Sequence, residues 1–178
     1  TKRFTDYTHV WLGIALALAP VGAWLAVRGG LSFAEPLGKT SGLIPLLLAL
    51  AVVFWLVGFD IIYATQDIEV DRRERLHSVP ARFGVATGLR IARASHAMTV
   101  ACLVALGVVA GLGVPYYVGV AGAAGLLVYE HSLVSPGDLS KVNVAFLNVN
   151  GYLAVSMLVM TIADYVTGWI TRGWIGVA

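Results

Sequence analysis

Five long apolar segments, separated by polar or glycine-rich links, set the pattern of this chain. We place them at residues 9–27, 42–64, 95–112, 116–129 and 144–166. As helices, most of them are long enough to cross a hydrocarbon core of about 30 Å at 1.5 Å per residue. No stretch shows the strict alternation that predicts a strand. The sequence therefore predicts an all-α, multi-span transmembrane bundle with five helices.

The links between these segments are rich in residues that interrupt helices. Residues 28–41 contain Gly29, Gly30 and Gly38, which favour a loop. Residues 65–92 are polar, and Pro80 disfavours helical backbone at Val79. Residues 130–142 contain a Pro-Gly turn. We expect loops at all three places.

The composition agrees with a membrane protein. Hydrophobic residues make up 58% of the 178 residues and charged residues 12%, against about 25% charged residues in soluble domains. The net charge of +2 gives no indication of a nucleic-acid partner. The single cysteine, Cys102, lies in an apolar segment and excludes an intrachain disulfide.

The basic residues are divided unevenly between the two sides of such a bundle. With five spans, the N-terminal residues share one side with links 65–92 and 130–142. That side has nine basic residues against three on the other: Lys2, Arg3, Arg72, Arg73, Arg75, Arg82, Arg90, Arg93 and Lys141 against Arg28, Lys39 and Arg172. The excess of basic residues on cytoplasmic loops predicts that the nine lie in the cytoplasm.

An acidic stretch follows the second apolar segment on this side. Four of the chain's ten acidic residues lie within eight positions, and Asp60 stands just before them inside the span. Residues three, four or seven apart share a helix face, so the sequence predicts one polar stripe that joins Asp60, Tyr63, Asp67 and Asp71. Carboxylates within a membrane segment usually mark a functional site.

The chemistry of this stretch suits a phosphate bound through a metal. Asp67 and Asp71 are hard oxygen ligands of the kind that Mg²⁺ accepts. Nearby Arg72, Arg75 and His77 are suited to the remaining phosphate charge. A solvated loop with salt bridges explains the spacing about as well, but it does not explain Asp60. A transporter that uses intramembrane carboxylates and a scaffold without chemistry remain alternatives, although a transporter is expected to place acids near mid-membrane on broken helices.

The stretch YATQDIEVDRRERLHSVPARFG resembles the second aspartate-rich motif of the UbiA superfamily of intramembrane prenyltransferases. The matching residues are Asp60, Tyr63, Ala64, Gln66, Asp67, Asp71, Ser78, Phe83 and Gly84. Lys2, Arg3 and Thr5 look like the family's K-R-x-T element, and YEHSLVSPGDLSKVNVAFLNVNG is similar to its connection between the eighth and ninth helices. The branch that the chain resembles most prenylates 4-hydroxybenzoate and related quinone precursors.

The resemblance implies a Mg²⁺-dependent transferase in the plasma membrane of a bacterium, acting in ubiquinone or menaquinone synthesis. Its substrates would be a polyprenyl diphosphate and an aromatic acid. Asp67 and Asp71 would hold the metal, and Asp60, Tyr63 and Gln66 would line the acceptor side. Lys2 and Arg3 would contact phosphate or the acceptor's carboxylate. Further contacts to substrate would come from Arg72, Arg75, His77 and Ser78.

The chain departs from the family pattern in four ways. The family's first motif, N-D-x-x-D-x-x-x-D, is absent, and nine helices are implied where this chain supplies five. We therefore expect residues 1–178 to be the C-terminal part of one membrane domain, and to be inactive alone. His77 stands where the family usually has Lys, and Arg75 where it commonly has Gly. The variant HSVPARFG, residues 77–84, suggests a sub-branch, such as one acting in menaquinone synthesis.

Other polar residues in or near the spans have simpler explanations. His9 and His96 lie at span ends, where we expect them at the membrane interface. Asn148 and Asn150 either form hydrogen bonds between helices or belong to the site. Asp164 is expected at the far interface.

Overall fold

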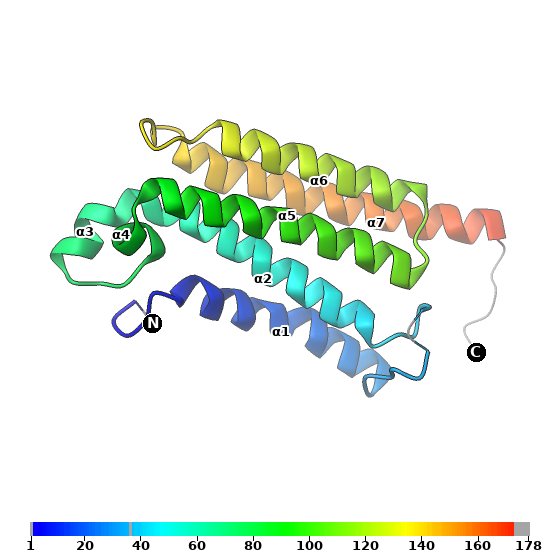
Figure 1. Ribbon diagram of the computed structural model, residues 1–178. Coiled ribbons are helices and arrows are strands. Elements are labelled where there is room, and N and C mark those ends of the chain that lie inside the picture. Colours follow the sequence, from blue (N-terminus) through cyan, green and yellow to red (C-terminus); the bar gives the residue numbers. More distant parts are fainter. Residues whose placement is uncertain (1, 36, 173–178) are drawn as a thin grey trace.

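The computed structural model describes residues 2–35 and 37–172, and it forms a bundle of antiparallel helices (Figure 1). Its five long helices are α1 (Thr8–Arg28), α2 (Leu43–Ala64), α5 (Val85–Ala110), α6 (Val114–Ser132) and α7 (Asn150–Arg172). Two short helices, α3 (Ile68–Arg73) and α4 (Val79–Phe83), lie at one end, next to the N-terminal residues. The described residues form no strand apart from isolated bridges. The all-α prediction is confirmed.

Helix α2 is the centre of the bundle, with α1 packed on one side and α5 on the other. At the end near α3, the core contains Ile61, Ile62 and Leu89, each at most 2% exposed. Helix α1 approaches α2 closely because Gly13 has no side chain; a Cβ there would lie 3.1 Å from backbone atoms of Val53. Helix α6 pairs with α7 and also contacts α5.

Within the described residues, four helical segments are long and apolar enough to cross a membrane: Thr8–Arg28, Leu43–Arg73, Val85–Ala110 and Val144–Ile170. Much of their outward surface is apolar, as at Leu18 on α1 and Val155 on α7, which are more than half exposed. Such surface suits contact with lipid. The fourth predicted span, α6, falls outside these four because tyrosines, Glu130 and His131 lower its hydropathy.

The third span begins earlier than predicted. We expected it from residue 95, but α5 starts at Val85. Its first turns are amphipathic: Leu89 and Ala92 are buried, whereas Arg90 and Arg93 are exposed. Hydropathy along the chain does not reveal this part of the helix, because the charged face masks the apolar one.

The prediction of a loop through residues 65–92 was wrong. The segment contains a 3₁₀ turn (Thr65–Asp67), α3, α4 and the start of α5. Val79 is the first residue of α4 even though Pro80 follows it. Ser78 Oγ accepts a hydrogen bond from the Ala81 N–H at 3.3 Å, and proline is well tolerated in a first helical turn. The Ser78 cap and the burial of Pro80 offset the preference of Val79 for non-helical backbone before a proline.

The fifth span contains an irregularity at its start. Residues Val144–Val149 form a π-helical turn, and α7 continues to Arg172, past the predicted end at residue 166. The amide Nδ2 of Asn150 donates to the carbonyl oxygens of Phe146 at 2.9 Å and Ala145 at 3.3 Å. A side chain that bonds the carbonyls of the preceding turn widens it locally.

Candidate functional site

The site begins where α2 ends. A 3₁₀ turn joins Ala64 to α3, and Thr65 closes it by donating its hydroxyl to the carbonyl of Ile62 at 2.6 Å. The two acidic residues of the predicted stripe that follow, Asp67 and Asp71, lie on either side of the start of α3. The side chain of Asp71 is 2% exposed and that of Asp67 is 47% exposed.

Both carboxylates converge on one ammonium group. Lys2 Nζ lies 3.2 Å from each carboxylate oxygen of Asp71 and 3.4 Å from Asp67 Oδ2. Residues 65 or more positions apart in the chain therefore meet at one point. The prediction that the basic N-terminal residues border the acidic stretch is correct for Lys2.

The N-terminal strap, residues 2–7, is fixed to α4 and the turn before it. The His77 N–H donates to the carbonyl of Lys2 at 2.6 Å. Asp6 is buried, accepts a hydrogen bond from Arg82, and pairs with His77 Nδ1 at 3.1 Å. Burial raises the pKa of Asp6, but the bonds from Arg82 and His77 outweigh it and hold that pKa below its usual value.

The other members of the predicted stripe have partners of their own. Asp60 Oδ2 lies 2.6 Å from His9 Nδ1, and the His9 ring is 2% exposed. The ring of Tyr63 stacks on Phe146, with centroids 4.4 Å apart. Phe59 and Trp55 extend this row of rings into the bundle, at centroid separations of 5.4 and 5.3 Å. Asp60 and Tyr63 thus lie on the same helix end as the acidic pair, but they contact α1 and the π turn.

Most of the remaining predicted residues are exposed at the same end of the bundle. Gln66 donates to Asn143 Oδ1 at 3.2 Å, and Arg72 donates to the carbonyl of Ala81 at 3.1 Å. Arg3 and Arg75 are exposed. Arg75 has a φ of 53°, which is the left-handed region. Ser78 is fully buried, and its hydroxyl caps α4.

The arrangement of Asp67 and Asp71 fits a divalent cation with oxygen ligands. Two carboxylates already face one positive charge, and Mg²⁺ takes one or two protein carboxylates and completes its shell with water and phosphate oxygens. The described residues contain no cluster of three His, Cys, Asp or Glu that could hold a metal alone. An ion held here needs further ligands from a substrate, from water or from outside this chain.

A second polar cluster lies inside the bundle, and of its members the sequence predicted only Asn150 as a residue that forms hydrogen bonds between helices. His96 Nδ1 is 3.0 Å from His131 Nε2, and Asn150 Nδ2 donates to Glu130 Oε1 at 3.4 Å. Trp55 Nε1 donates to Asn150 Oδ1 at 2.7 Å. The cluster joins α2, α5, α6 and α7.

His96 does not lie at a span end as expected, because it stands well inside α5 and is 2% exposed. His9 lies at the start of α1 as expected, but its side chain is also buried, at 2% exposure. The His96 ring packs against Gly58 of α2, where a Cβ would lie 2.1 Å from the ring. The glycine within this apolar helix is the feature of the sequence that is related to the burial of His96. Asp164, expected at the far interface, accepts the Gly113 N–H at 2.8 Å in the link between α5 and α6.

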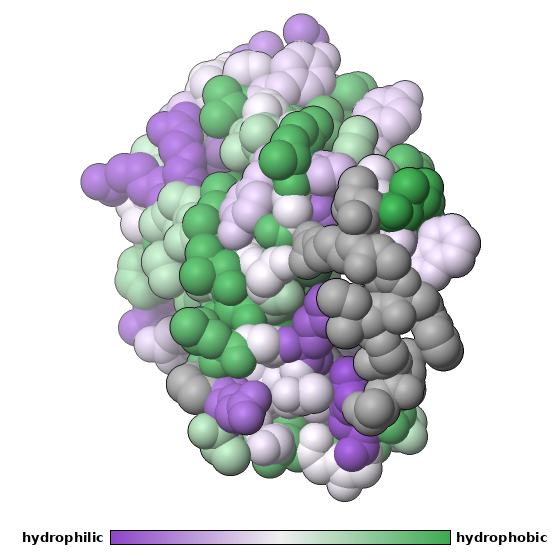
Figure 2. All heavy atoms as spheres, turned by 90° about the vertical axis from the view of Figure 1, so that its right-hand side faces the viewer, coloured by the Kyte–Doolittle hydropathy of each residue, from purple (hydrophilic) through white to green (hydrophobic). Residues whose placement is uncertain are grey.

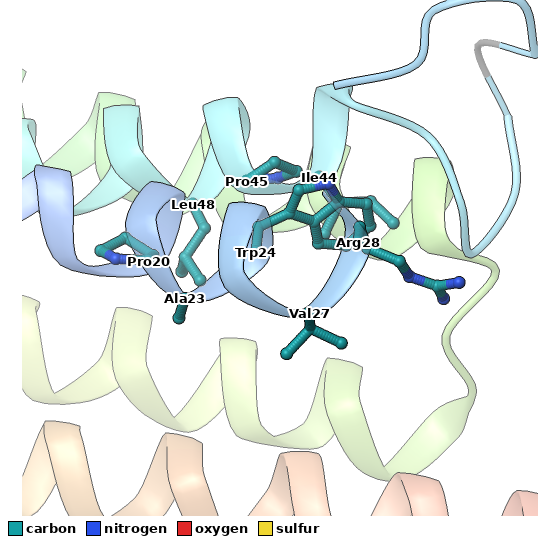
Figure 3. Close-up of a pocket in the computed structure, with 8 residues that line it drawn as sticks. All are labelled: Pro20, Ala23, Trp24, Val27, Arg28, Ile44, Pro45 and Leu48. Carbon is teal, nitrogen blue, oxygen red and sulfur yellow. The ribbon is translucent and has the colours of Figure 1, made fainter. Parts of the chain in front are cut away.

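A groove of about 340 Å³ lies between the end of α1 and the start of α2. Figure 3 shows apolar side chains such as Trp24 and Leu48 along it. It lies at the end of the bundle that is away from Asp67. Figure 2 views this end of the bundle, whose surface is a mixture of hydrophilic and hydrophobic residues. The groove therefore plays no part in the acidic site.

Comparison with known proteins finds similarity along nearly the whole chain. The sequence profile of the UbiA prenyltransferase family matches residues 1–173. A 4-hydroxybenzoate octaprenyltransferase from Nitrosospira multiformis is 29% identical over 93% of this chain and 53% of its own length. One from Pseudomonas aeruginosa is 33% identical over 92% of the chain and 51% of its length. The 4-hydroxybenzoate geranyltransferase 1 of Lithospermum erythrorhizon is 33% identical over 79% and 43%.

The fold has a solved counterpart. The apo structure of a UbiA homolog from Aeropyrum pernix K1 superposes with a TM-score of 0.72 at 30% identity, covering 89% of this chain and 57% of that one. The chain spans about half the length of the curated relatives that it matches. With the family profile covering nearly all of its residues, the chain belongs to the UbiA prenyltransferase family.

Proposed function

We propose that this chain carries the C-terminal half of a membrane enzyme that transfers a polyprenyl group from a polyprenyl diphosphate to an aromatic acceptor of the 4-hydroxybenzoate type. The observation that carries the proposal is the convergence of Asp67 and Asp71 on one cation position at the end of α2. The names of the relatives support the reaction class. An upstream half with the family's first acidic motif would complete the site.

Asp67 and Asp71 would hold Mg²⁺, which supplies a Lewis acid for the diphosphate leaving group when it is bound. The basic residues of this end would bind the remaining phosphate charge: Lys2, Arg3, Arg72, Arg75 and His77. Arginine suits this role because its planar guanidinium pairs with two phosphate oxygens at once. Exposure of Arg3 and Arg75 leaves both available to a solute.

The chemistry requires a site that excludes water. The C–O bond of the allylic diphosphate breaks, and an aromatic ring carbon of the acceptor attacks the prenyl carbon and then loses its proton. Water would capture the allylic cation, so the lining must be dry. The rings of Tyr63, Phe59 and Phe146 supply an apolar wall next to the acidic end. Asp60 and Gln66 would orient the polar groups of the acceptor.

The orientation and setting form part of the proposal. The uneven distribution of basic residues favours a cytoplasmic location of α3 and α4 in a bacterial plasma membrane. His77 and Arg75, which differ from the common family pattern, are the reason to test acceptors of both ubiquinone and menaquinone synthesis. The acids at residues 67–74 lie at a helix end beside arginines, which suits phosphate better than the mid-membrane sites of a transporter.

The proposal is tested by assaying the intact protein, reconstituted in lipid, with a polyprenyl diphosphate and a panel of aromatic acids that includes 4-hydroxybenzoate. We expect a prenylated product that disappears with chelator and returns with Mg²⁺. Residues 1–178 alone should give no product above an Asp71→Ala control. Absence of product from the intact protein with every acceptor, under conditions where a known relative is active, would reject the reaction.

A further inference from the structure

We propose that Lys2 is a tethered counter-ion, which occupies the divalent-cation position between Asp67 and Asp71 and must leave it before a metal binds. The inference deepens the proposed function and rests on it. It assigns the N-terminal strap a second part in the site, namely control of access to the carboxylates.

The contacts place one ammonium where a metal would be held. Lys2 Nζ lies 3.2 Å from both oxygens of Asp71 and 3.4 Å from Asp67 Oδ2, so three carboxylate oxygens surround it. In the part of the chain that the structure describes, no other cation forms an ion pair with either carboxylate. Lys2 is therefore the cation that balances the negative charge of Asp67 and Asp71.

The burial of Asp71 explains why such a balance is needed. Its side chain is 2% exposed, and a buried carboxylate without a partner is costly. Two carboxylates that face each other also repel. In the absence of metal, the Lys2 ammonium satisfies both groups and keeps them close together.

The ammonium and the metal exclude each other. Mg²⁺ binds oxygen at about 2.0–2.1 Å in a nearly octahedral shell, which takes the same carboxylate oxygens that Lys2 now contacts. An ammonium offers no lone pair to the metal, and its charge repels a dication. Metal binding thus requires the Lys2 side chain to turn away.

The strap keeps the displaced ammonium nearby. The bond between the His77 N–H and the Lys2 carbonyl holds the backbone, and Asp6 anchors the other end through Arg82 and His77. A tethered group competes at a high effective concentration. Once displaced, Lys2 remains beside the site, where a diphosphate oxygen can take the place of the carboxylates as its partner.

The direct test measures the affinity of the purified chain for Mn²⁺, by electron paramagnetic resonance, in place of Mg²⁺. Loss of a charged hydrogen bond that competes with the metal should tighten binding in Lys2→Met by about tenfold or more. Arg3→Met is the matched control, because it removes the neighbouring charge, and it should tighten binding only slightly. Lys2→Arg keeps the charge and should bind Mn²⁺ nearly as weakly as the original chain.

The proposal is overturned if Lys2→Met binds Mn²⁺ no more tightly than the original chain, or if Arg3→Met gives the same gain. Circular dichroism on each variant shows whether the helices are retained. Lys2→Arg is a second, independent test, because this variant keeps the positive charge. Tight Mn²⁺ binding by Lys2→Arg also overturns the proposal.

The role of Asp6 as a positioning residue is tested by a double-mutant cycle. Asp6→Asn should loosen the strap and give a Mn²⁺ affinity between those of the original chain and Lys2→Met. In the Lys2→Met background the same change should have no further effect, because the competing ammonium is already gone. Additive effects would show that Asp6 does not act through Lys2.

A third measurement separates this inference from the proposed function. Binding of inorganic pyrophosphate in the presence of Mg²⁺ should weaken in Lys2→Met, opposite to the change in metal affinity. Opposite shifts support the exchange of Lys2 between carboxylate and phosphate, whereas shifts in the same direction contradict it. If the metal shift is present but the intact protein transfers no prenyl group, the counter-ion stands and the proposed reaction fails.

Discussion

Arg75 adopts a left-handed backbone conformation, with φ at 53°, just after α3 ends. This conformation costs a residue with a Cβ roughly 1–2 kcal/mol, and glycine adopts it freely. The position is also the one where the family commonly has Gly. The strain is explained if the arginine side chain contributes to binding, as proposed above.

We predict that Arg75→Gly raises the free energy of unfolding of the detergent-solubilised chain by about 1 kcal/mol, and with it the melting temperature, because the backbone strain is released. Arg73→Gly is the matched control. It lies in the last turn of α3, where glycine lowers helix stability by about the same amount. A lower melting temperature for Arg75→Gly than for the original chain would contradict the assignment of strain.

Gly58 makes room for the buried cluster around His96. A Cβ at this position would lie 2.1 Å from His96 Nε2, so Gly58→Ala must move either the ring or α2. We predict that Gly58→Ala lowers the free energy of unfolding by about 1–3 kcal/mol, which is the usual cost of overpacking a core. Gly122→Ala, at a helical position with no atom within 4 Å of the added carbon, should be neutral or stabilising. Thermal unfolding of both variants checks this, and equal melting temperatures would argue against a His96 ring packed on Gly58.

At the scale of elements, the hydropathy pattern predicted the five long helices and, within one residue, both ends of α1 and α2, but not the start of α5 or the end of α7. The apolar segments correspond to α1, α2, α5, α6 and α7. The start of α5 and helix α4 were missed because charged side chains cover an exposed face and because a serine cap overcomes the influence of Pro80. Such effects depend on tertiary contacts, which a one-dimensional pattern does not contain.

The candidate site was predicted only in part, for a similar reason. The spacing identified Asp67 and Asp71, and the distribution of charges brought Lys2 to their side of the membrane. The pairing of Asp60 with His9 and the bond between Asn150 and Trp55 join helices far apart in the chain. No spacing rule within one segment reveals contacts of this kind.

The strap provides a prediction about pH at this scale. The pKa of Asp6 is held below its usual value, so the folded chain binds a proton there less readily than the unfolded chain. Its contribution to stability is therefore fully present above the unfolded pKa of about 3.9 and is lost as the pH falls through the folded pKa. We expect the original chain to have a higher melting temperature than Asp6→Asn at about pH 5, and we follow this difference on acidification. This difference in melting temperature should shrink below about pH 4. A difference that grows on acidification would contradict a lowered pKa of Asp6 in the folded chain.

At the scale of the whole molecule, the basic residues predict that α3 and α4 face the cytoplasm. Ser78 is fully buried and is unsuited to labelling, whereas the side chain of Glu74 is 56% exposed. In a Cys102→Ala background, we expect Glu74→Cys in intact cells to be protected from an impermeant thiol reagent. Lys39→Cys, at the other end of the bundle, should be labelled. The reverse pattern would show the opposite orientation.

The central claim is that Asp67 and Asp71 together hold the metal that binds the diphosphate. Asp67 is the better residue for a test, because it is half exposed and its loss leaves the buried pair of Asp71 and Lys2 in place. Glu69 is a matched control: it is acidic, exposed and only two positions away, but it forms no ion pair among the described residues.

The most direct measurement is the rate of prenyl transfer by the intact protein, at saturating Mg²⁺ and polyprenyl diphosphate, in Asp67→Ala and Glu69→Ala. Loss of one ligand should lower turnover in Asp67→Ala roughly 10²-fold or more, of the order of one strong transition-state contact. Glu69→Ala should retain nearly normal turnover. Near-normal turnover in Asp67→Ala, or an equal loss in both variants, would contradict the claim that the Asp67–Asp71 pair forms the metal site.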